Sequence, residues 1–311
     1  MENLVSGERF LSRIKLSERT IIIMAFFAVY VIWGSTYLGI KYAIETFPPF
    51  IMSGVRVLIA GLILHAVAQY SNAPKANWKN WKNSTIVGFL LIVIGNGGLV
   101  WAEQKVPSGI AALLITIEPL WVVLLQMVFR ERKGFHYVLW IAMVLAFSGM
   151  LMLMGPSVFN GISSVDPMGF FVIMISTLGW AAGSLYAVKA DLPTSPARST
   201  SMQMISASVI LLVISVFTGE WNSFDLANIS DRSYFAFGYL VIFGSVVGYS
   251  AYSYLTRSVS PSKVSTYAYV NPVIAVLLGT LIGGEPFNAS VLISGVMIIS
   301  AVVLIMTKGN S

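Results

Sequence analysis

Residues 107–129 read PSGIAALLITIEPLWVVLLQMVF, an apolar run in which Glu118 is the one ionisable residue. A helix needs about 20 consecutive apolar residues to cross the hydrocarbon core of a bilayer, so this run predicts a membrane-spanning helix. The strands of membrane β-barrels alternate apolar and polar residues instead, and this run does not alternate. The stretch therefore predicts a helical membrane protein with one carboxyl group near mid-membrane.

The composition of the whole chain agrees with this stretch. Of its 311 residues, 57% are hydrophobic and 10% are charged, whereas a soluble domain carries about 25% charged residues. These values exclude an ordinary soluble protein, and the many apolar residues exclude a disordered one. The chain has no cysteine and two histidines, so we expect no thiol chemistry, no metal site and no catalytic residues.

A window of about 19 residues identifies ten apolar segments, which we expect to be transmembrane helices. They are residues 20–40, 48–70, 85–102, 107–129, 137–155, 168–188, 199–219, 234–255, 264–283 and 289–307. The polar residues 1–19 lack the features of a signal peptide, so we expect them to form a tail that stays in the cytoplasm.

The basic residues predict the orientation in the membrane. If the N-terminus is cytoplasmic, fifteen of the 19 Lys and Arg residues fall on the cytoplasmic side, and three, Lys41, Lys105 and Arg232, fall outside. Cytoplasmic loops of membrane proteins hold an excess of Lys and Arg. The sequence therefore predicts a multi-pass protein of the cytoplasmic (inner or plasma) membrane with both termini inside.

The two halves of the chain contain similar motifs. The first span contains WGSTYLGIK at residues 33–41, and the sixth contains WAAGSLYAVK at residues 180–189. Glu118-Pro119 in the fourth span corresponds to Asn271-Pro272 in the ninth. Because five is odd, a five-helix unit that is repeated in tandem has its second copy inverted. We expect two inverted five-helix repeats, residues 20–155 and 168–307.

These motifs resemble those of the EamA-type ten-helix transporters of the drug/metabolite transporter superfamily. The resemblance rests on the string from Trp33 to Lys41, on Pro48-Pro49 and Arg56, and on the region around Glu118-Pro119. It implies a secondary transporter that works by alternating access and exports a small organic solute. That family includes exporters of amino acids, drugs and other metabolites, so the substrate stays open. The second repeat departs from the first in lacking counterparts of Arg56 and Glu118.

Glu118 is the sharpest functional candidate. A charged side chain at the bilayer centre costs at least about 2.5–3.5 kcal/mol on insertion scales, and such residues usually face a cavity or a partner. Glu118 could bind a substrate amine, carry a coupling proton, or pair with Arg56, which could itself be structural. Pro119 and Pro272 either free backbone groups for binding or only shape their helices.

Aromatic residues supply a second signal. Tyr30, Trp33 and Tyr37 lie on one face of the first span. Aromatic rings near span ends anchor at the membrane interface, whereas rings at mid-depth can line a cavity that attracts cations and flat solutes. The substrate-binding candidates are Glu118, Trp33, Tyr37, Asn96, Trp121, Trp180, Tyr249, Tyr252, Tyr267 and Asn271, with Arg56, Pro119 and Pro272 as structural or coupling residues.

The sequence thus favours a secondary transporter that exports an amino acid-like or amphiphilic solute, with uptake or exchange as the alternative within the same fold. A channel is disfavoured because no pore motif is present, and an intramembrane enzyme because no nucleophile–base pair is evident. We expect a small-molecule substrate and the lipid bilayer as partners, without cofactor or nucleic acid. Proton coupling stays open, as does the choice between a monomer and a homodimer.

Overall fold

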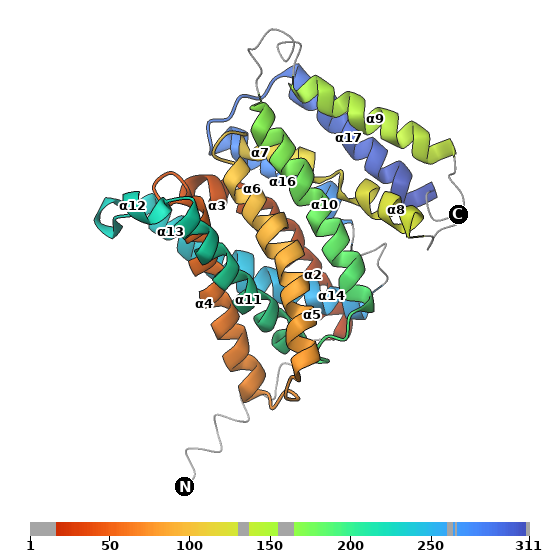
Figure 1. Ribbon diagram of the computed structural model, residues 1–311. Helices are drawn as coiled ribbons and strands as arrows, with labels where there is room; N and C mark the ends of the chain where they lie inside the picture. Colours follow the sequence, from red (N-terminus) through yellow and green to blue (C-terminus); the bar gives the residue numbers. More distant parts are fainter. Residues whose placement is uncertain (1–16, 130–136, 155–164, 260–263, 265, 309–311) are drawn as a thin grey trace.

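The protein consists of helices and short connections in the residues that the computed structural model describes, which are 17–129, 137–154, 165–259, 264 and 266–308 (Figure 1). No strand occurs in this part of the chain. Seven helical segments are long and apolar enough to cross a membrane, and three shorter apolar helices accompany them. These findings confirm an all-α multi-pass membrane protein. The predicted tail lies outside the described residues as far as residue 16.

The first half of the chain contains five helical segments. The first runs without a break through α2 (Glu18–Phe27), η1 (Ala28–Ile32) and α3 (Trp33–Ala43). The others are α4 (Pro49–Tyr70), α5 (Trp78–Gly88) with η2 (Phe89–Gly97) and α6 (Gly98–Ala102), α7 (Ser108–Ile115) with α8 (Glu118–Val128), and α9 (Tyr137–Met154).

The second half also contains five long segments. They are α10 (Pro167–Lys189), α11 (Pro196–Phe217), α13 (Asp231–Tyr239) with η5 (Leu240–Val247) and α14 (Gly248–Ser258), α16 (Tyr267–Leu281) and α17 (Ala289–Lys308). Two short elements, α12 (Glu220–Ser223) and η4 (Leu226–Asn228), lie in the connection between α11 and α13.

Helix starts follow from local capping chemistry. The Asn77 side chain accepts from the Asn80 amide while the Asn80 side chain accepts from the Asn77 amide, which starts the third segment before the apolar run. The Asp166 side chain accepts from the Gly169 amide at the start of α10, the Ser195 side chain accepts from the Arg198 amide at the start of α11, and each cap is followed by a proline. Proline suits the first helical position because its missing N–H would have no partner there.

The fourth segment is interrupted in its middle. Helix α7 ends at Ile115 and α8 begins at Glu118, with Thr116 and Ile117 between them. Pro119 lies in the first turn of α8, where its lack of an amide hydrogen costs no helical bond. At the corresponding place in the second half, Pro272 lies inside α16, which continues through it.

Three stretches, η1, η2 and η5, are wound as π-helices within longer α-helical segments. Such wider turns are rare and often occur at functional sites, because they redirect side chains and loosen backbone hydrogen bonds. Here η1 directly precedes Trp33, η2 contains Asn96, and η5 contains Ser245. All three therefore lie next to the pocket described below.

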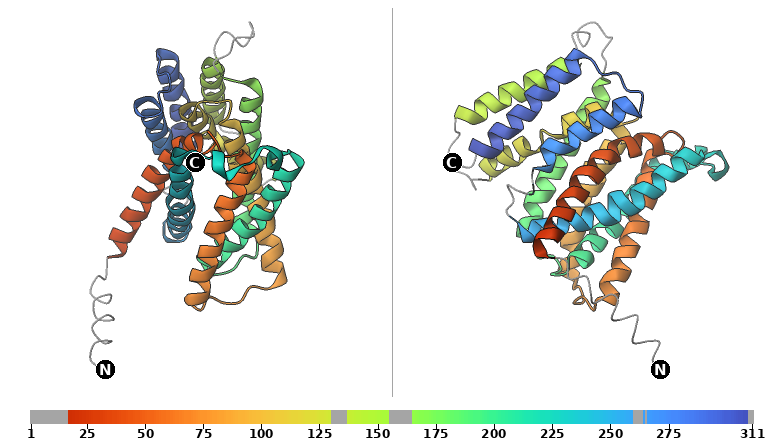
Figure 2. Two further views of the ribbon diagram at one scale, coloured as in Figure 1. Left: turned by 90° about the vertical axis from the view of Figure 1, so that its left-hand side faces the viewer. Right: turned by 180° about the vertical axis from the view of Figure 1, so that it is seen from behind.

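The helices pack in corresponding pairs. The most extensive contacts join α4 to α11 and α9 to α17, and the second pair lies side by side at one edge of the bundle in Figures 1 and 2. Between these pairs, α3 packs on α16 and α8 packs on α10. The pocket lies where α3, α4, α10 and α16 approach one another.

Candidate functional site

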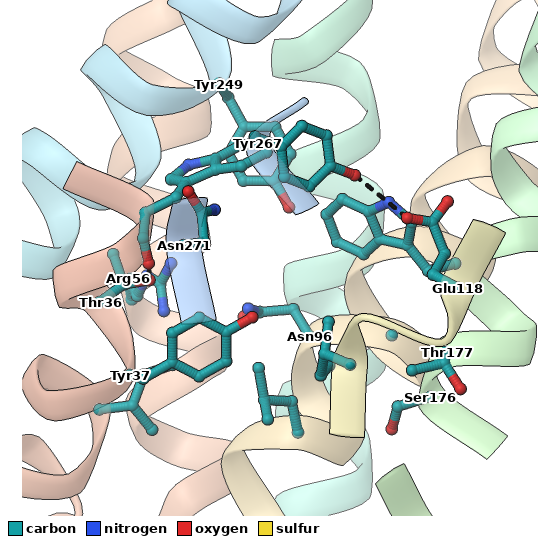
Figure 3. A pocket seen from close by; sticks show the side chains of 16 residues that line it. Thr36, Tyr37, Arg56, Asn96, Glu118, Ser176, Thr177, Tyr249, Tyr267 and Asn271 are labelled. Atoms are coloured by element: carbon teal, nitrogen blue, oxygen red, sulfur yellow. Dashed lines mark hydrogen bonds between the residues drawn. The ribbon is translucent and has the colours of Figure 1, made fainter. Parts of the chain in front are cut away.

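A pocket in the interior of the bundle gathers most of the residues that the sequence predicts for binding. Its lining combines aromatic, polar and charged side chains from both halves of the chain (Figure 3). The lining residues are Trp33, Thr36, Tyr37, Ile40, Arg56, Gly95, Asn96, Leu99, Ile115, Glu118, Ser176, Thr177, Trp180, Tyr249, Tyr267 and Asn271.

Trp33 lies at the centre of the aromatic wall, the group of pocket-lining rings formed by Trp33, Trp180, Tyr249 and Tyr267. Its ring centroid lies 5.4 Å from that of Tyr249, 5.7 Å from that of Tyr267 and 6.3 Å from that of Trp180, in edge-to-face arrangements that aromatic rings prefer. The indole nitrogen donates to the carbonyl of Gly244, 3.2 Å away in η5. These contacts tie helices from both halves together around one side chain.

Glu118 stands at the helix interruption and faces the pocket. Its position in the first turn of α8 places the carboxylate at the positive end of the helix dipole, which stabilises a negative charge. The hydroxyl of Tyr267 donates to Glu118 Oε2 at 3.1 Å (Figure 3). The interruption thus presents an acidic group to the pocket, and a tyrosine from the other half holds it.

Arg56 contributes the opposite charge. Its side chain is 2% exposed, and its Nε donates to Ser245 Oγ at 2.9 Å. The terminal nitrogen Nη1 of Arg56 has no hydrogen-bond partner among the described residues. Figure 3 shows Arg56 and Glu118 on opposite sides of the pocket, so the structure does not pair them as a static lock. A buried guanidinium with an unused donor is suited to receive an anionic group.

Two asparagines line the pocket in different ways. The side-chain oxygen of Asn96 is buried and has no partner among the described residues. The amide of Asn271, with its nitrogen turned toward two carbonyls, donates to Tyr267 O at 3.3 Å and to Tyr30 O at 3.1 Å. Asn271 therefore joins α16 to η1, whereas Asn96 keeps an acceptor available to a ligand.

Two predicted residues lie behind the wall. Trp121 donates from its indole nitrogen to Thr177 Oγ1 at 3.0 Å, and Thr177 itself lines the pocket. Tyr252 packs on Trp33 with 5.1 Å between ring centroids. Both residues support side chains of the lining and are not part of it.

Several lining residues were not predicted. Thr36 and Ile40 lie three and seven residues after Trp33, on the same side of the helix. Extending the aromatic face of Trp33 and Tyr37 to its other residues would therefore have predicted them. Ser176 and Thr177 lie one turn before Trp180 on α10. Small hydroxyl residues in membrane helices commonly bond to their own backbone, as Thr177 does to Met174, and give no distinctive signal.

A charged contact lies at the end of α3. Lys41 Nζ lies 3.1 Å from Glu285 Oε1 and donates to the carbonyl of Gly283 at 2.9 Å. Glu285 also accepts from the amide and hydroxyl of Ser108 and from the amide of Gly109, at 2.7–2.9 Å. This Lys41–Glu285 contact joins α3, the start of α7 and the connection after α16.

The same bonds determine the charge of Glu285. Burial by itself would raise the pKa of the Glu285 carboxyl, but the hydrogen bonds from Gly109, Ser108 and Lys41 outweigh it and leave the pKa below its ordinary value. Glu285 is therefore a carboxylate at physiological pH. It occupies the N-terminus of α7, where anions are stabilised.

The sequence matches a known family twice. The EamA-like transporter family corresponds to residues 20–155 and again to residues 167–307. The chain belongs to the EamA-like transporter family. Together the two matched regions include every residue that lines the pocket.

Curated relatives are similar to this chain over most of their length. The inner membrane transporter YedA of Escherichia coli (strain K12) is 38% identical over 90% of this chain and 89% of its own. A chloroplastic WAT1-related protein of Arabidopsis thaliana is 27% identical over 94% of this chain and 70% of its own. The transporter YvbV of Bacillus subtilis is 24% identical over 94% and 93%.

A solved crystal structure has the same fold. It is 16% identical to this chain, covers 91% of it and 95% of its own length, and superposes with a TM-score of 0.63. At this identity the likeness concerns fold alone. The relatives and the matched family, together with the apolar helices, show that the protein is a membrane transporter.

Proposed function

We propose that this EamA-like protein is a secondary transporter that exports a small amino acid-like zwitterion through the central pocket. The observation that carries the proposal is the placement of Glu118 and Arg56 on opposite sides of one aromatic pocket. An ammonium group would bind at Glu118, and a carboxylate would bind at the free donor of Arg56. An apolar substituent would pack on Trp33 and Trp180.

The proposed architecture is ten spans in two inverted repeats. Helices α3 and α8 belong to the first and fourth spans of the first half, and α10 and α16 are the first and fourth spans of the second half. The first span of each half packs on the fourth span of the other half, α3 on α16 and α10 on α8. The third and eighth spans both contain a central π-helical stretch, η2 and η5. Inverted repeats place the substrate site between them near the bilayer midplane, and the pocket draws on both halves.

The proposed orientation has both termini in the cytoplasm. Each of the three basic residues that it places outside has an acidic partner: Lys41 with Glu285, Lys105 with Asp166, and Arg232 with Glu45. The orientation itself rests on the number of basic residues, fifteen inside against three outside, because the rule for cytoplasmic loops counts Lys and Arg and not the net charge. In this orientation the Lys41–Glu285 contact closes the outer end of the bundle.

Alternating access then follows from two conformations. In the one described here, the Lys41–Glu285 contact holds the outer ends of α3, α7 and α16 together. Opening that end would require the contact to break while the opposite end closes. Because only a substrate or ion that binds the two conformations differently can shift their balance, the charged pocket and this contact are the groups to test.

A counterflow experiment with purified protein in proteoliposomes tests the proposed substrate. L-phenylalanine, L-threonine and the cationic amphiphile tetraphenylphosphonium would be compared for saturable exchange. We expect the amino acids to exchange, and Arg56→Gln to weaken their exchange. Arg198→Gln is the matched control, because Arg198 is also buried but bonds to Gln69 and Ala73, away from the pocket.

Two results would count against the proposal. Exchange of tetraphenylphosphonium without exchange of either amino acid would show that the aromatic wall and Glu118 serve cations. Equal effects of Arg56→Gln and Arg198→Gln would show that Arg56 acts through stability and not through the substrate carboxylate.

A further inference from the structure

Glu103 is a buried acid outside the pocket that the proposed substrate site does not use. It follows the last residue of α6 and is 6% exposed. Both of its carboxylate oxygens are inaccessible and lack a hydrogen-bond partner among the described residues. Almost all buried polar atoms in proteins have such a partner, so a carboxyl group with two unpaired oxygens requires an explanation.

The surroundings of Glu103 disfavour a negative charge. Leu99, Ala102 and Val106 beside it in the chain belong to the main apolar cluster. The carboxyl also lies at the carboxyl end of a helix, where the dipole repels anions. A charge that is buried without a partner is far more costly than the neutral acid. The neutral, protonated form is therefore the one that this environment accepts.

The charged groups near Glu103 make no hydrogen bond to it. Its charge interacts at a distance with Glu285, Arg56 and Lys41. Lys41 is bonded to Glu285. Arg56 bonds to Ser245 through Nε, and its free Nη1 makes no hydrogen bond to Glu103.

The other elements packed against α6 supply no partner either. Tyr37 of α3 lies near Glu103, but its neutral hydroxyl makes no hydrogen bond to the carboxyl group. Helix α10 contributes Asp166 at its near end, which pairs with Lys105, and η2 contains no titratable residue. Among the described residues, no cation neutralises Glu103 by direct contact.

Glu103 also lies between the pocket and the outer end. Leu99, one helical turn earlier on the same face, lines the pocket, as does Tyr37. On the other side, Lys41 and Glu285 form the contact that closes the outer end. Opening that end would expose Glu103 to water, and closing it would bury the group again.

We propose that Glu103 is a proton-binding site whose protonation accompanies closure of the outer end. The proton comes from the outer solution and forms an O–H bond on the carboxylate before the group is buried. The closed conformation then binds the proton more tightly than the open one, so by linkage an acidic exterior favours closure. Resting on the proposed export function, this inference makes the pH of the outer solution a regulator of the export cycle.

A proton fits this position better than a metal cation. Metal cations such as Ca²⁺ take six or more oxygen ligands, whereas a proton needs only the carboxylate oxygen itself. Among the described residues, no group of three or more His, Cys, Asp or Glu side chains could hold a metal ion. The proposal therefore commits to H⁺, and Na⁺ becomes an alternative that the experiment below distinguishes.

Infrared spectroscopy of the purified full-length protein tests the site without any substrate. At pH 7 we expect a protonated-carboxyl C=O band that Glu118→Gln and the surface control Glu45→Gln retain. We expect Glu103→Gln to lose this band and Glu103→Asp to keep one. If wild type has no such band, or if Glu103→Gln retains it in full, Glu103 is not a proton site.

Transport in proteoliposomes tests the coupling. An acidic exterior should accelerate efflux of L-phenylalanine in wild type, and Glu103→Gln should keep the exchange but lose the acceleration. Loss of acceleration with retained exchange is not expected of a merely structural residue. Equal acceleration in wild type and Glu103→Gln, or acceleration by Na⁺ at constant pH, would overturn the proposal. If wild type does not transport the amino acid, the proposed substrate class fails, while the infrared band still decides the proton site.

Discussion

Removing the Glu285 carboxylate should destabilise the protein much more than removing another paired acid at the same end of the bundle. In Glu285→Ala, the first amides of α7 at Ser108 and Gly109 lose their acceptor, and Lys41 loses its partner. A hydrogen bond to a charged group contributes about 1.5–3 kcal/mol, and breaking a buried ion pair costs about 3–5 kcal/mol. We therefore expect a loss of about 3–5 kcal/mol.

Glu45→Ala is the matched control. Glu45 and Arg232 are 3.4 Å apart, but their side chains are 38% and 54% exposed, and such a surface pair contributes about 0–1 kcal/mol. The free energy of unfolding in mixed detergent micelles, titrated with a denaturing detergent, measures both variants. Equal losses, or a loss below about 1 kcal/mol for Glu285→Ala, would refute the role given to the Lys41–Glu285 contact.

The pH dependence of this difference has a definite sign. Because the folded protein holds the Glu285 pKa below its ordinary value of 4.5, the stabilisation is fully present above that value. It is lost as the pH falls through the lowered pKa of the folded state. The difference between wild type and Glu285→Ala should therefore be constant from neutral pH to about pH 5 and shrink only in stronger acid. A difference that already declines between pH 7 and pH 5 would contradict this.

Two further substitutions test the pocket. Gly248→Ala would place a methyl group onto the indole nitrogen of Trp33, at an overpacking cost of about 1–3 kcal/mol. Tryptophan fluorescence and counterflow should both change, whereas Gly238→Ala, which meets no atom within 4 Å, should change neither. Tyr267→Phe removes the hydroxyl that orients Glu118. Loss of this hydrogen bond costs about 1 kcal/mol, so the half-saturation constant for the exchanged amino acid should rise several-fold. An unchanged constant would show that Glu118 does not depend on this bond.

The sequence predicts the membrane helices well because long apolar runs are a strong and local signal. It places the start of the third helix too late, at residue 85, because the polar residues from Trp78 onward lower the mean hydropathy. The structure shows that the cap formed by Asn77 and Asn80 starts the helix there. Local hydrogen bonds, and not hydropathy, set that boundary.

The candidate site is predictable only in part. Glu118 and Trp33 stand out because a mid-span charge and an aromatic helix face are visible in the sequence. Glu103 does not stand out, because an acidic residue just after a transmembrane helix is usually exposed to water. In the structure, Glu103 is buried only because other helices pack over it. Trp121 has the right spacing from Glu118, yet its ring turns toward Thr177 behind the lining. Which side of a helix faces a cavity depends on its neighbours.

Counterflow of Glu118→Gln, measured with the amino acid that wild type exchanges fastest, tests whether the substrate binds in the charged pocket. The substitution keeps the size of the side chain and removes its charge, so a bound ammonium group loses a charge-assisted hydrogen bond. That loss of at least about 1.4 kcal/mol should raise the half-saturation constant about tenfold or more at neutral pH. The surface variant Glu45→Gln should match wild type. An unchanged half-saturation constant and rate in Glu118→Gln would contradict the account, because the solute would then cross without using the charged pocket.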